Sequence, residues 1–182
     1  MTIDIPGYRP GTYELDPAHS EVGFEVRHMM ISKVRGAFTV KSATIVLPEN
    51  VLEASVTATA DAASLDTKDE GRDQHLRSAD FFDAEQHPTL TFTSTGVREN
   101  GGDLLVDGDL TIKDVTRPVT FELELGGFGT DPWGNYKAGA TAVASINRED
   151  FGLTWNAALE TGGVLVGKDV KITLDLQGAL AA

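Results

Sequence analysis

Apolar and polar residues alternate along most of this chain, and that alternation constrains the fold more than any other feature. The pattern is clear after the turn at Asp16-Pro17, where Val22, Phe24 and Val26 share one face and mostly charged residues share the other. A period of two residues is typical of a β-strand with one buried face. The same pattern returns at residues 52–60, 89–95, 104–112, 119–125, 136–146 and 170–176.

These repeated segments predict an all-β fold of about eight to ten antiparallel strands. Turn signals such as Asn100-Gly101-Gly102 separate neighbouring segments, and strands do not alternate with helices. An antiparallel sheet that closes on itself leaves no unpaired strand edge. We therefore expect an extended β-barrel, with residues 1–182 forming a single domain and residues 1–12 forming an N-terminal arm.

One short helix is expected between two of the strands. Thr67 and Glu70 have the spacing of a capping box, in which the threonine hydroxyl caps the helix and the glutamate reaches back. The helix should span residues 68–78. Phe81 and Phe82 follow it, and a short helix beside two adjacent phenylalanines needs apolar contacts. We expect this segment to cover one opening of the barrel.

Composition narrows the set of functions. The net charge of −13 and the pI of about 4.6 disfavour binding to nucleic acid or to an anionic membrane surface. The absence of cysteine excludes disulfides, zinc–thiolate sites and cysteine nucleophiles. No apolar run is long enough for a membrane span, so no stable membrane insertion is expected. The first residues do not resemble a secretory signal, and we expect a cytoplasmic protein.

Residues suited to catalysis or metal binding form no recognised pattern. The four histidines, at positions 19, 28, 75 and 87, lack the spacing of a metal site. A metal would require His28 to meet another histidine across the fold, and structural or mouth-lining histidines are the better interpretation. The chain has no nucleophile elbow and no phosphate-binding loop. We therefore predict no catalytic residue and no metal.

Two rows of alanine favour a tunnel over a filled core inside the barrel. Ala54, Ala58 and Ala60 share one strand face, and the alanines at positions 138, 140, 142 and 144 share another. Side chains normally fill an eight-stranded barrel, and an apolar gap left by small residues accepts an apolar ligand. The alternative is that alanine marks close contact with a neighbouring helix or with a second subunit, as in a homodimer.

Several segments carry a more specific signature: DPAHSEVGFEVRH with KVRGAF, HLRSADFFDAEQHPTLTF, GDLTIKDVTRPVTF, INREDFGL and VGKDVKITLDL. In this order they resemble the YceI-like, polyisoprenoid-binding family over nearly the whole chain. The resemblance implies a lipocalin-like, extended antiparallel β-barrel that binds a long isoprenoid chain without catalysis. Two departures are the lack of a secretion signal, which many members carry, and Asp114, where the family often has glycine.

Three functions are open to such a barrel: a carrier or store of a polyisoprenoid lipid, an enzyme using His and Asp residues at the mouth, and a scaffold with a packed interior. We favour the first, with a quinone or polyprenyl phosphate as the lipid and no other cofactor. His28, Arg35 and Arg77 are candidates for holding the lipid head, and surface charge pairing is the alternative. The predicted ligand-binding residues are Phe24, Val26, His28, Arg35, Phe38, Val40, Val56, Ala58, Arg77, Phe81, Phe82, Phe92, Leu110, Phe121, Ala140, Ala142, Ile146 and Trp155.

Overall fold

Ten β-strands dominate the computed structural model, which describes residues 4–157, 159 and 165–181. The strands are β1 (Gly11–Leu15), β2 (Glu21–His28), β3 (Ser32–Phe38), β4 (Val40–Leu47), β5 (Ser55–Asp61), β6 (Thr89–Asn100), β7 (Asp103–Ile112), β8 (Val115–Thr130), β9 (Tyr136–Asn147) and β10 (Val166–Leu180). The α-helix, α1, spans Glu70–Arg77. Short 3-10 helices span Pro17–His19, Val51–Glu53, Ala62–Ser64 and Arg148–Phe151.

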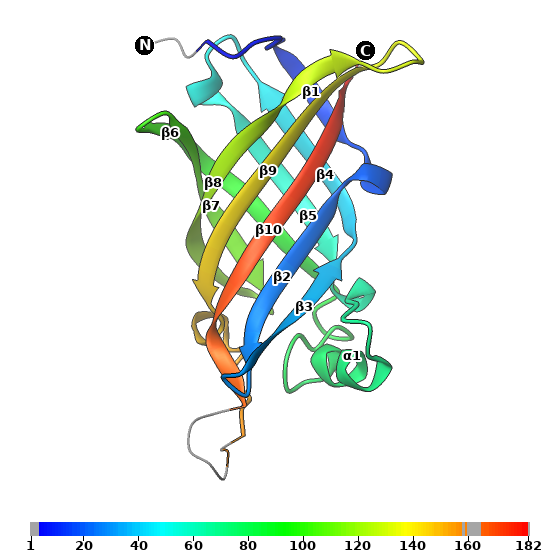
Figure 1. Cartoon of the computed structure of the whole chain (residues 1–182), viewed down its shortest axis with the longest axis vertical. Coiled ribbons are helices and arrows are strands. Elements are labelled where there is room, and N and C mark those ends of the chain that lie inside the picture. Colours follow the sequence, from blue (N-terminus) through cyan, green and yellow to red (C-terminus); the bar gives the residue numbers. More distant parts are fainter. Residues whose placement is uncertain (1–3, 158, 160–164, 182) are drawn as a thin grey trace.

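Eight of the strands close into an antiparallel barrel (Figure 1). Their order is β1-β4-β5-β6-β7-β8-β9-β10, and β10 returns to pair with β1. This closing contact is short, with residues 13–15 of β1 opposite residues 178–180 of β10. The other two strands, β2 and β3, form a hairpin that pairs with the earlier part of β10. The structure thus confirms the predicted all-β class and the extended, closed barrel with one short helix.

Strand β7 illustrates why these segments fold as they do. Its burial alternates residue by residue, so that Leu104, Val106 and Leu110 are buried while Asp103 and Asp109 are exposed. One face therefore supplies apolar surface to the inside of the barrel, and the other face is hydrated. Residues from β7, β8 and β9 join the segment 151–153 in one hydrophobic core cluster.

The segment between β5 and β6 completes one end of the barrel. Strand β3 pairs with β2 along one edge, and its other edge meets this segment. The main chains of Ala37 and Asp66 exchange two hydrogen bonds of 3.0 Å. Phe81 and Phe82, from the same segment, line the interior of the barrel. Helix α1 lies at this end of the barrel (Figure 1). This arrangement confirms that the helix and the phenylalanine pair cover one opening.

The start of α1 differs from the predicted capping box. Asp69 is the N-cap, and its carboxylate accepts the amide of Arg72 at 3.0 Å. Thr67 instead donates its hydroxyl to the carboxylate of Asp73, which also accepts the amide of Thr67. Thr67 stands outside the helix because Lys68 has a φ of +64°, which turns the chain before α1 begins.

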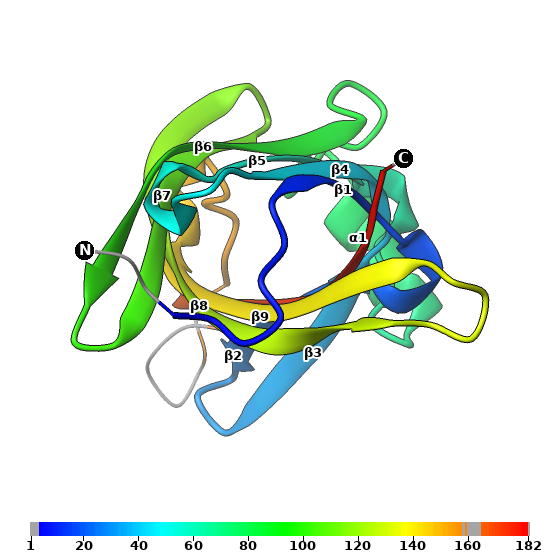
Figure 2. The same ribbon diagram turned by 90° about the horizontal axis from the view of Figure 1, so that it is seen from above.

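The N-terminal arm crosses the end of the barrel opposite to α1 (Figure 2). Tyr8 donates its hydroxyl to the carbonyl of Pro48 at 2.6 Å and packs edge-on against Phe128. Tyr136 donates its hydroxyl to the carbonyl of Gly7. Because β1 already begins at residue 11, the described part of the arm spans residues 4–10 and is shorter than predicted. These contacts hold the arm across the barrel end.

Candidate ligand-binding cavity

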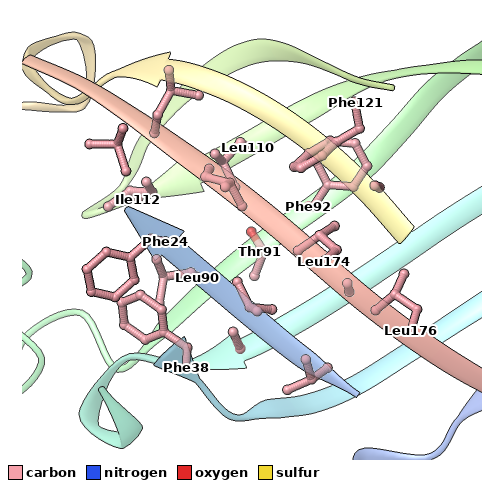
Figure 3. A pocket seen from close by; sticks show the side chains of 18 of the residues that line it. Phe24, Phe38, Leu90, Thr91, Phe92, Leu110, Ile112, Phe121, Leu174 and Leu176 are labelled. Atoms are coloured by element: carbon pink, nitrogen blue, oxygen red, sulfur yellow. The ribbon is translucent and has the colours of Figure 1, made fainter. Parts of the chain in front are cut away.

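A cavity of about 650 Å³ occupies the barrel and is lined almost entirely by apolar side chains. In Figure 3, Phe24 and Phe38 lie on one side of this space, with Phe92, Leu110 and Phe121 farther along it. The volume falls within the range typical of small-molecule sites, roughly 300–1,000 Å³. Side chains therefore do not fill the interior, and the packed-scaffold alternative is wrong.

The cavity reaches both ends of the barrel. Tyr13 and Phe128 line it near the arm, and their rings pack edge-on with centroids 6.2 Å apart. At the α1 end, the wall includes His75, Phe81 and Trp155. The ring centroid of His75 is 5.2 Å from that of Phe81 and 4.6 Å from that of Trp155. Aromatic side chains thus border the cavity at each end.

The structure places all but two of the predicted ligand-binding residues in the cavity wall. Their parity on alternating strands accounts for this, since one face of each strand points inward. Contact between these residues and a ligand stays a prediction. The wall includes Phe24, Val26, His28, Phe38, Val40, Val56, Ala58, Phe81, Phe82, Phe92, Leu110, Phe121, Ala140, Ala142, Ile146 and Trp155.

Small side chains help to keep the interior open. Ala58 on β5 and Ala140 and Ala142 on β9 line the cavity, where a larger side chain would fill part of it. At these positions alanine faces the cavity and not a second subunit, which was the alternative. Both rows are shorter than predicted. Ala54 caps a 3-10 helix before β5, and Ala144 is buried in the hydrophobic core cluster.

Arg35 and Arg77 are absent from the cavity wall, which corrects their assignment as head-group candidates. Arg35 is exposed, and its Nε lies 3.0 Å from the Glu25 carboxylate across the β2–β3 hairpin. Arg77 donates to the main-chain carbonyls of Ala63 and Leu65 at 3.1 and 3.0 Å. Arg35 therefore follows the surface-pairing alternative, and Arg77 anchors α1 to the segment before it.

Polar groups of the wall gather at the α1 end of the cavity. His28 lies there, as predicted, together with Arg27 at the end of β2. Arg72 and His75 of α1 join them, with Asp69 as the carboxylate at the start of the helix. Sequence reasoning missed Arg27 and Arg72, and it considered His75 only as a structural or mouth-lining histidine. The available signal was the spacing of residues 69, 72 and 75, because positions three apart share one helix face.

His75 also pairs with an aspartate at the barrel mouth. Its Nε2 lies 2.9 Å from the carboxylate of Asp80, and both side chains are partly exposed. A histidine–aspartate pair at this position is the arrangement that the enzymatic alternative requires. Across residues 4–157, 159 and 165–181, no group of three or more His, Cys, Asp or Glu side chains is arranged to hold a metal ion.

Arg148 is a buried cation in the same wall, with only 3% of its surface exposed. Its guanidinium donates to the main-chain carbonyls of Gly167 at 2.7 Å, Trp155 at 3.0 Å and Val166 at 3.3 Å, and also to that of Leu153. Burial lowers the pKa of this guanidinium because removal from water disfavours its charged form. The side chain ties the 3-10 helix after β9 to the beginning of β10.

Comparison with known proteins agrees with this architecture. Residues 13–178 match the family model of the YceI-like domain. The chain belongs to the YceI-like family. Among the curated relatives of this YceI-like chain, a UPF0312 protein of Staphylococcus aureus is 41% identical over 161 residues, which cover 87% of this chain and 92% of the relative.

Solved structures place the chain beside other YceI-like barrels. BcnA of Burkholderia cenocepacia superposes with a TM-score of 0.76 at 27% identity, covering 90% of this chain and 98% of BcnA. A Campylobacter jejuni YceI protein gives 0.69 at 28% identity, covering 92% and 97%. A polyisoprenoid binding domain from Saccharophagus degradans gives 0.69 at 15% identity, covering 95% and 100%, a likeness of fold alone. Within the described part of this YceI-like chain, no helix combines the length and apolarity needed to cross a membrane.

Proposed function

We propose that this protein holds a long-chain polyisoprenoid lipid, of the quinone or polyprenyl phosphate type, inside the barrel for carriage or storage. The observation that carries the proposal is the apolar cavity of about 650 Å³ between the strands. The neighbour of the same fold from Saccharophagus degradans is described as a polyisoprenoid binding domain, which supports this choice of ligand class. A hydrocarbon tail suits a wall that offers large apolar area and few polar partners.

The hydrophobic effect supplies the driving force for such a ligand. Each methylene group moved from water into the cavity contributes about 0.8 kcal/mol. The affinity should therefore rise with the length of tail that the cavity encloses. The net gain is smaller than this sum because association and ordering of the tail cost free energy.

The two ends of the cavity suggest how the lipid is oriented. Near the arm, the wall is made of apolar and aromatic groups such as Tyr13 and Phe128. At the α1 end, it contains Arg27, His28 and Arg72. We therefore place the tail toward the arm and the polar head toward α1, where charged and hydrogen-bonding side chains compensate for its loss of water.

Mass spectrometry of an organic extract of the purified protein tests the proposal directly. The unaltered protein should release a polyisoprenoid in near-stoichiometric amount. Ala142→Phe fills the cavity from β9, where Ala142 is 4% exposed, and should abolish co-purification while the barrel still folds. Val143→Phe is the matched control, because Val143 lies on the opposite face of the same strand and outside the cavity wall.

Two results would contradict the proposal. One is an extract of the unaltered protein that contains no isoprenoid even after expression with excess lipid. The other is an Ala142→Phe protein that is less stable yet carries its full lipid load, since overpacking a filled region costs about 1–3 kcal/mol without affecting a ligand elsewhere. Circular dichroism separates loss of folding from loss of lipid.

We further propose that the protein acts by binding and not by catalysis. The enzymatic alternative rests on the pair formed by His75 and Asp80. His75→Ala should release a lipid of the same mass as the unaltered protein. Recovery of a chemically different lipid from the variant would show that the pair transforms its ligand.

A further inference from the structure

The β2–β3 hairpin ends in a strained turn. Its tip, residues 29–31, connects the two strands through Met29 and Met30, whose φ angles are +54° and +60°. Positive φ is unfavourable for side chains other than glycine, asparagine and aspartate. The turns after β6 and β7 adopt positive φ through Gly101-Gly102 and Lys113-Asp114, which include residues suited to it. Turn geometry therefore does not explain methionine at both positions of the tip.

The same tip presents apolar side chains to solvent. Met29 is 41% exposed, Met30 67% and Ile31 79%. Scattered apolar residues on a surface need no explanation, but a contiguous exposed cluster indicates contact with another surface. The combination of strain and exposure is typical of a position kept for function at some cost in stability.

Positive charges flank the tip and define the kind of surface it fits. Arg27, Lys33 and Arg35 lie on the two strands beside it, and residues 26–37 include no acidic side chain. The carboxylate of Glu25 pairs with Lys33 at 3.1 Å and with Arg35 at 3.0 Å, so this one anion offsets part of the charge of the three cations. At physiological ionic strength, charges more than about 10 Å away are largely screened. A surface that approaches the tip therefore interacts mainly with the positive charges near the tip, although the whole chain has a net charge of −13.

The hairpin also forms part of the cavity wall. Val26, Arg27, His28 and Val34 line the cavity from β2 and β3. The tip lies at the α1 end of the barrel, away from the end that carries the arm (Figure 1). The beginning of β10 lies beside the hairpin and adds Lys168 and Asp169, and Lys168 lies 3.8 Å from the carboxylate of Glu149, so this neighbour adds no positive excess of its own.

We propose that the tip docks this protein transiently on an anionic lipid bilayer. In the docked state the three apolar side chains enter the headgroup region, and the flanking cations contact lipid phosphates. The α1 end of the cavity then faces the membrane. Of the flanking cations only Arg27 also borders the cavity, whereas the apolar tip, Lys33 and Arg35 lie outside its wall, so the docking does not depend on which ligand the cavity holds.

Flotation with vesicles of phosphatidylglycerol and phosphatidylcholine tests the docking. The protein should float with these vesicles, and each net positive charge at the tip should strengthen binding roughly fivefold relative to pure phosphatidylcholine. Raising the salt concentration should weaken binding. The triple variant Met29→Asn, Met30→Gly, Ile31→Thr should reduce the partition coefficient by about tenfold or more, because burial of a large apolar side chain contributes at least that factor.

The triple variant cannot lose binding merely by unfolding. Asn-Gly is the pair that such turns prefer, so its thermal midpoint should equal or exceed that of the unaltered protein. Trp133→Ser is the matched control, because Trp133 is 83% exposed in the connection between β8 and β9. This connection lies at the opposite end of the barrel from the tip (Figure 1). This control should float as well as the unaltered protein.

A fluorescent label locates the contact. Because the chain has no cysteine, Ile31→Cys or Trp133→Cys carries an environment-sensitive dye at one known position. Only the dye at position 31 should shift to the blue when anionic vesicles are added. Equal flotation of the triple variant would overturn the proposal, as would loss of flotation in Trp133→Ser alone. The proposal would also be overturned if the protein did not bind vesicles but dimerised through the tip, because the tip would then be a protein interface.

Discussion

Arg148→Met should destabilise the barrel more than most single substitutions. The unaltered side chain is almost fully buried and donates to four main-chain carbonyls, at residues 153, 155, 166 and 167. Methionine has a similar length but no donor, so these carbonyls lose their partner. The change acts where the 3-10 helix after β9 meets the beginning of β10.

The structure sets the size of the effect through two opposing contributions. Hydrogen bonds to a charged donor are worth about 1.5–3 kcal/mol each, which gives roughly 6–12 kcal/mol for four. Against this stands the cost of dehydrating the guanidinium, several kcal/mol, which also lowers the pKa of Arg148. We expect a net loss of about 3–5 kcal/mol in the free energy of unfolding.

Urea unfolding followed by circular dichroism measures this loss, and tryptophan fluorescence shows where it occurs. In a Trp133→Phe background Trp155 is the sole tryptophan, and its carbonyl is one of the four acceptors. Arg148→Lys is the matched control, since it keeps the charge but cannot reach all four carbonyls. It should lose less stability than Arg148→Met. A methionine variant within about 1 kcal/mol of the unaltered protein would refute the argument.

Two further predictions concern β7. In Gly108→Ala the new Cβ would lie 2.3 Å from the ring of Phe92 and 2.7 Å from the main-chain oxygen of Thr93. We therefore expect the free energy of unfolding, measured with urea, to fall by about 1–3 kcal/mol. Unchanged stability would contradict this packing. A hydrogen bond from Arg98, and a weaker contribution from Thr120, lower the pKa of Asp107 from 3.8 to about 2. The ionised carboxylate therefore stabilises the fold above about pH 4, and this stabilisation is lost as the pH falls toward 2. Arg98→Gln should raise that pKa in a titration followed by NMR, and an unchanged value would contradict the ion pair.

The inward faces of the strands could be predicted from sequence because the signal is local. A residue two positions along a strand must point to the same side, so Phe24, Phe92 and Phe121 could be assigned to the interior before their neighbours were known. The same logic identified Ala58 and Ala142 as small residues on inward faces. Closure of the barrel followed from the number of strands and the need to pair their edges.

The orientation of long polar side chains could not be predicted in this way. Arg77 lies on the predicted helix, but main-chain carbonyls from residues 63 and 65 take its donors, and only the folded chain brings them together. Arg148 follows an asparagine and precedes two acidic residues, a setting typical of an exposed turn. Its burial depends on β10, which is far away in the sequence. The alternation of residues along each strand thus predicted the apolar wall of the cavity better than the polar side chains at its α1 end.

The short contact between β1 and β10 has a consequence for how the nascent chain folds. Tyr13 and Leu180 face each other across the closure, so the barrel cannot be sealed until nearly all described residues have been synthesised. Contacts between residues so far apart in sequence slow folding, because closing the long loop costs entropy before any pairing compensates for it. Until β10 is in place, β1, β2 and β9 each keep an unpaired edge, and such edges promote aggregation. Pairing of β10 therefore converts an open sheet, which is prone to aggregation, into a closed barrel.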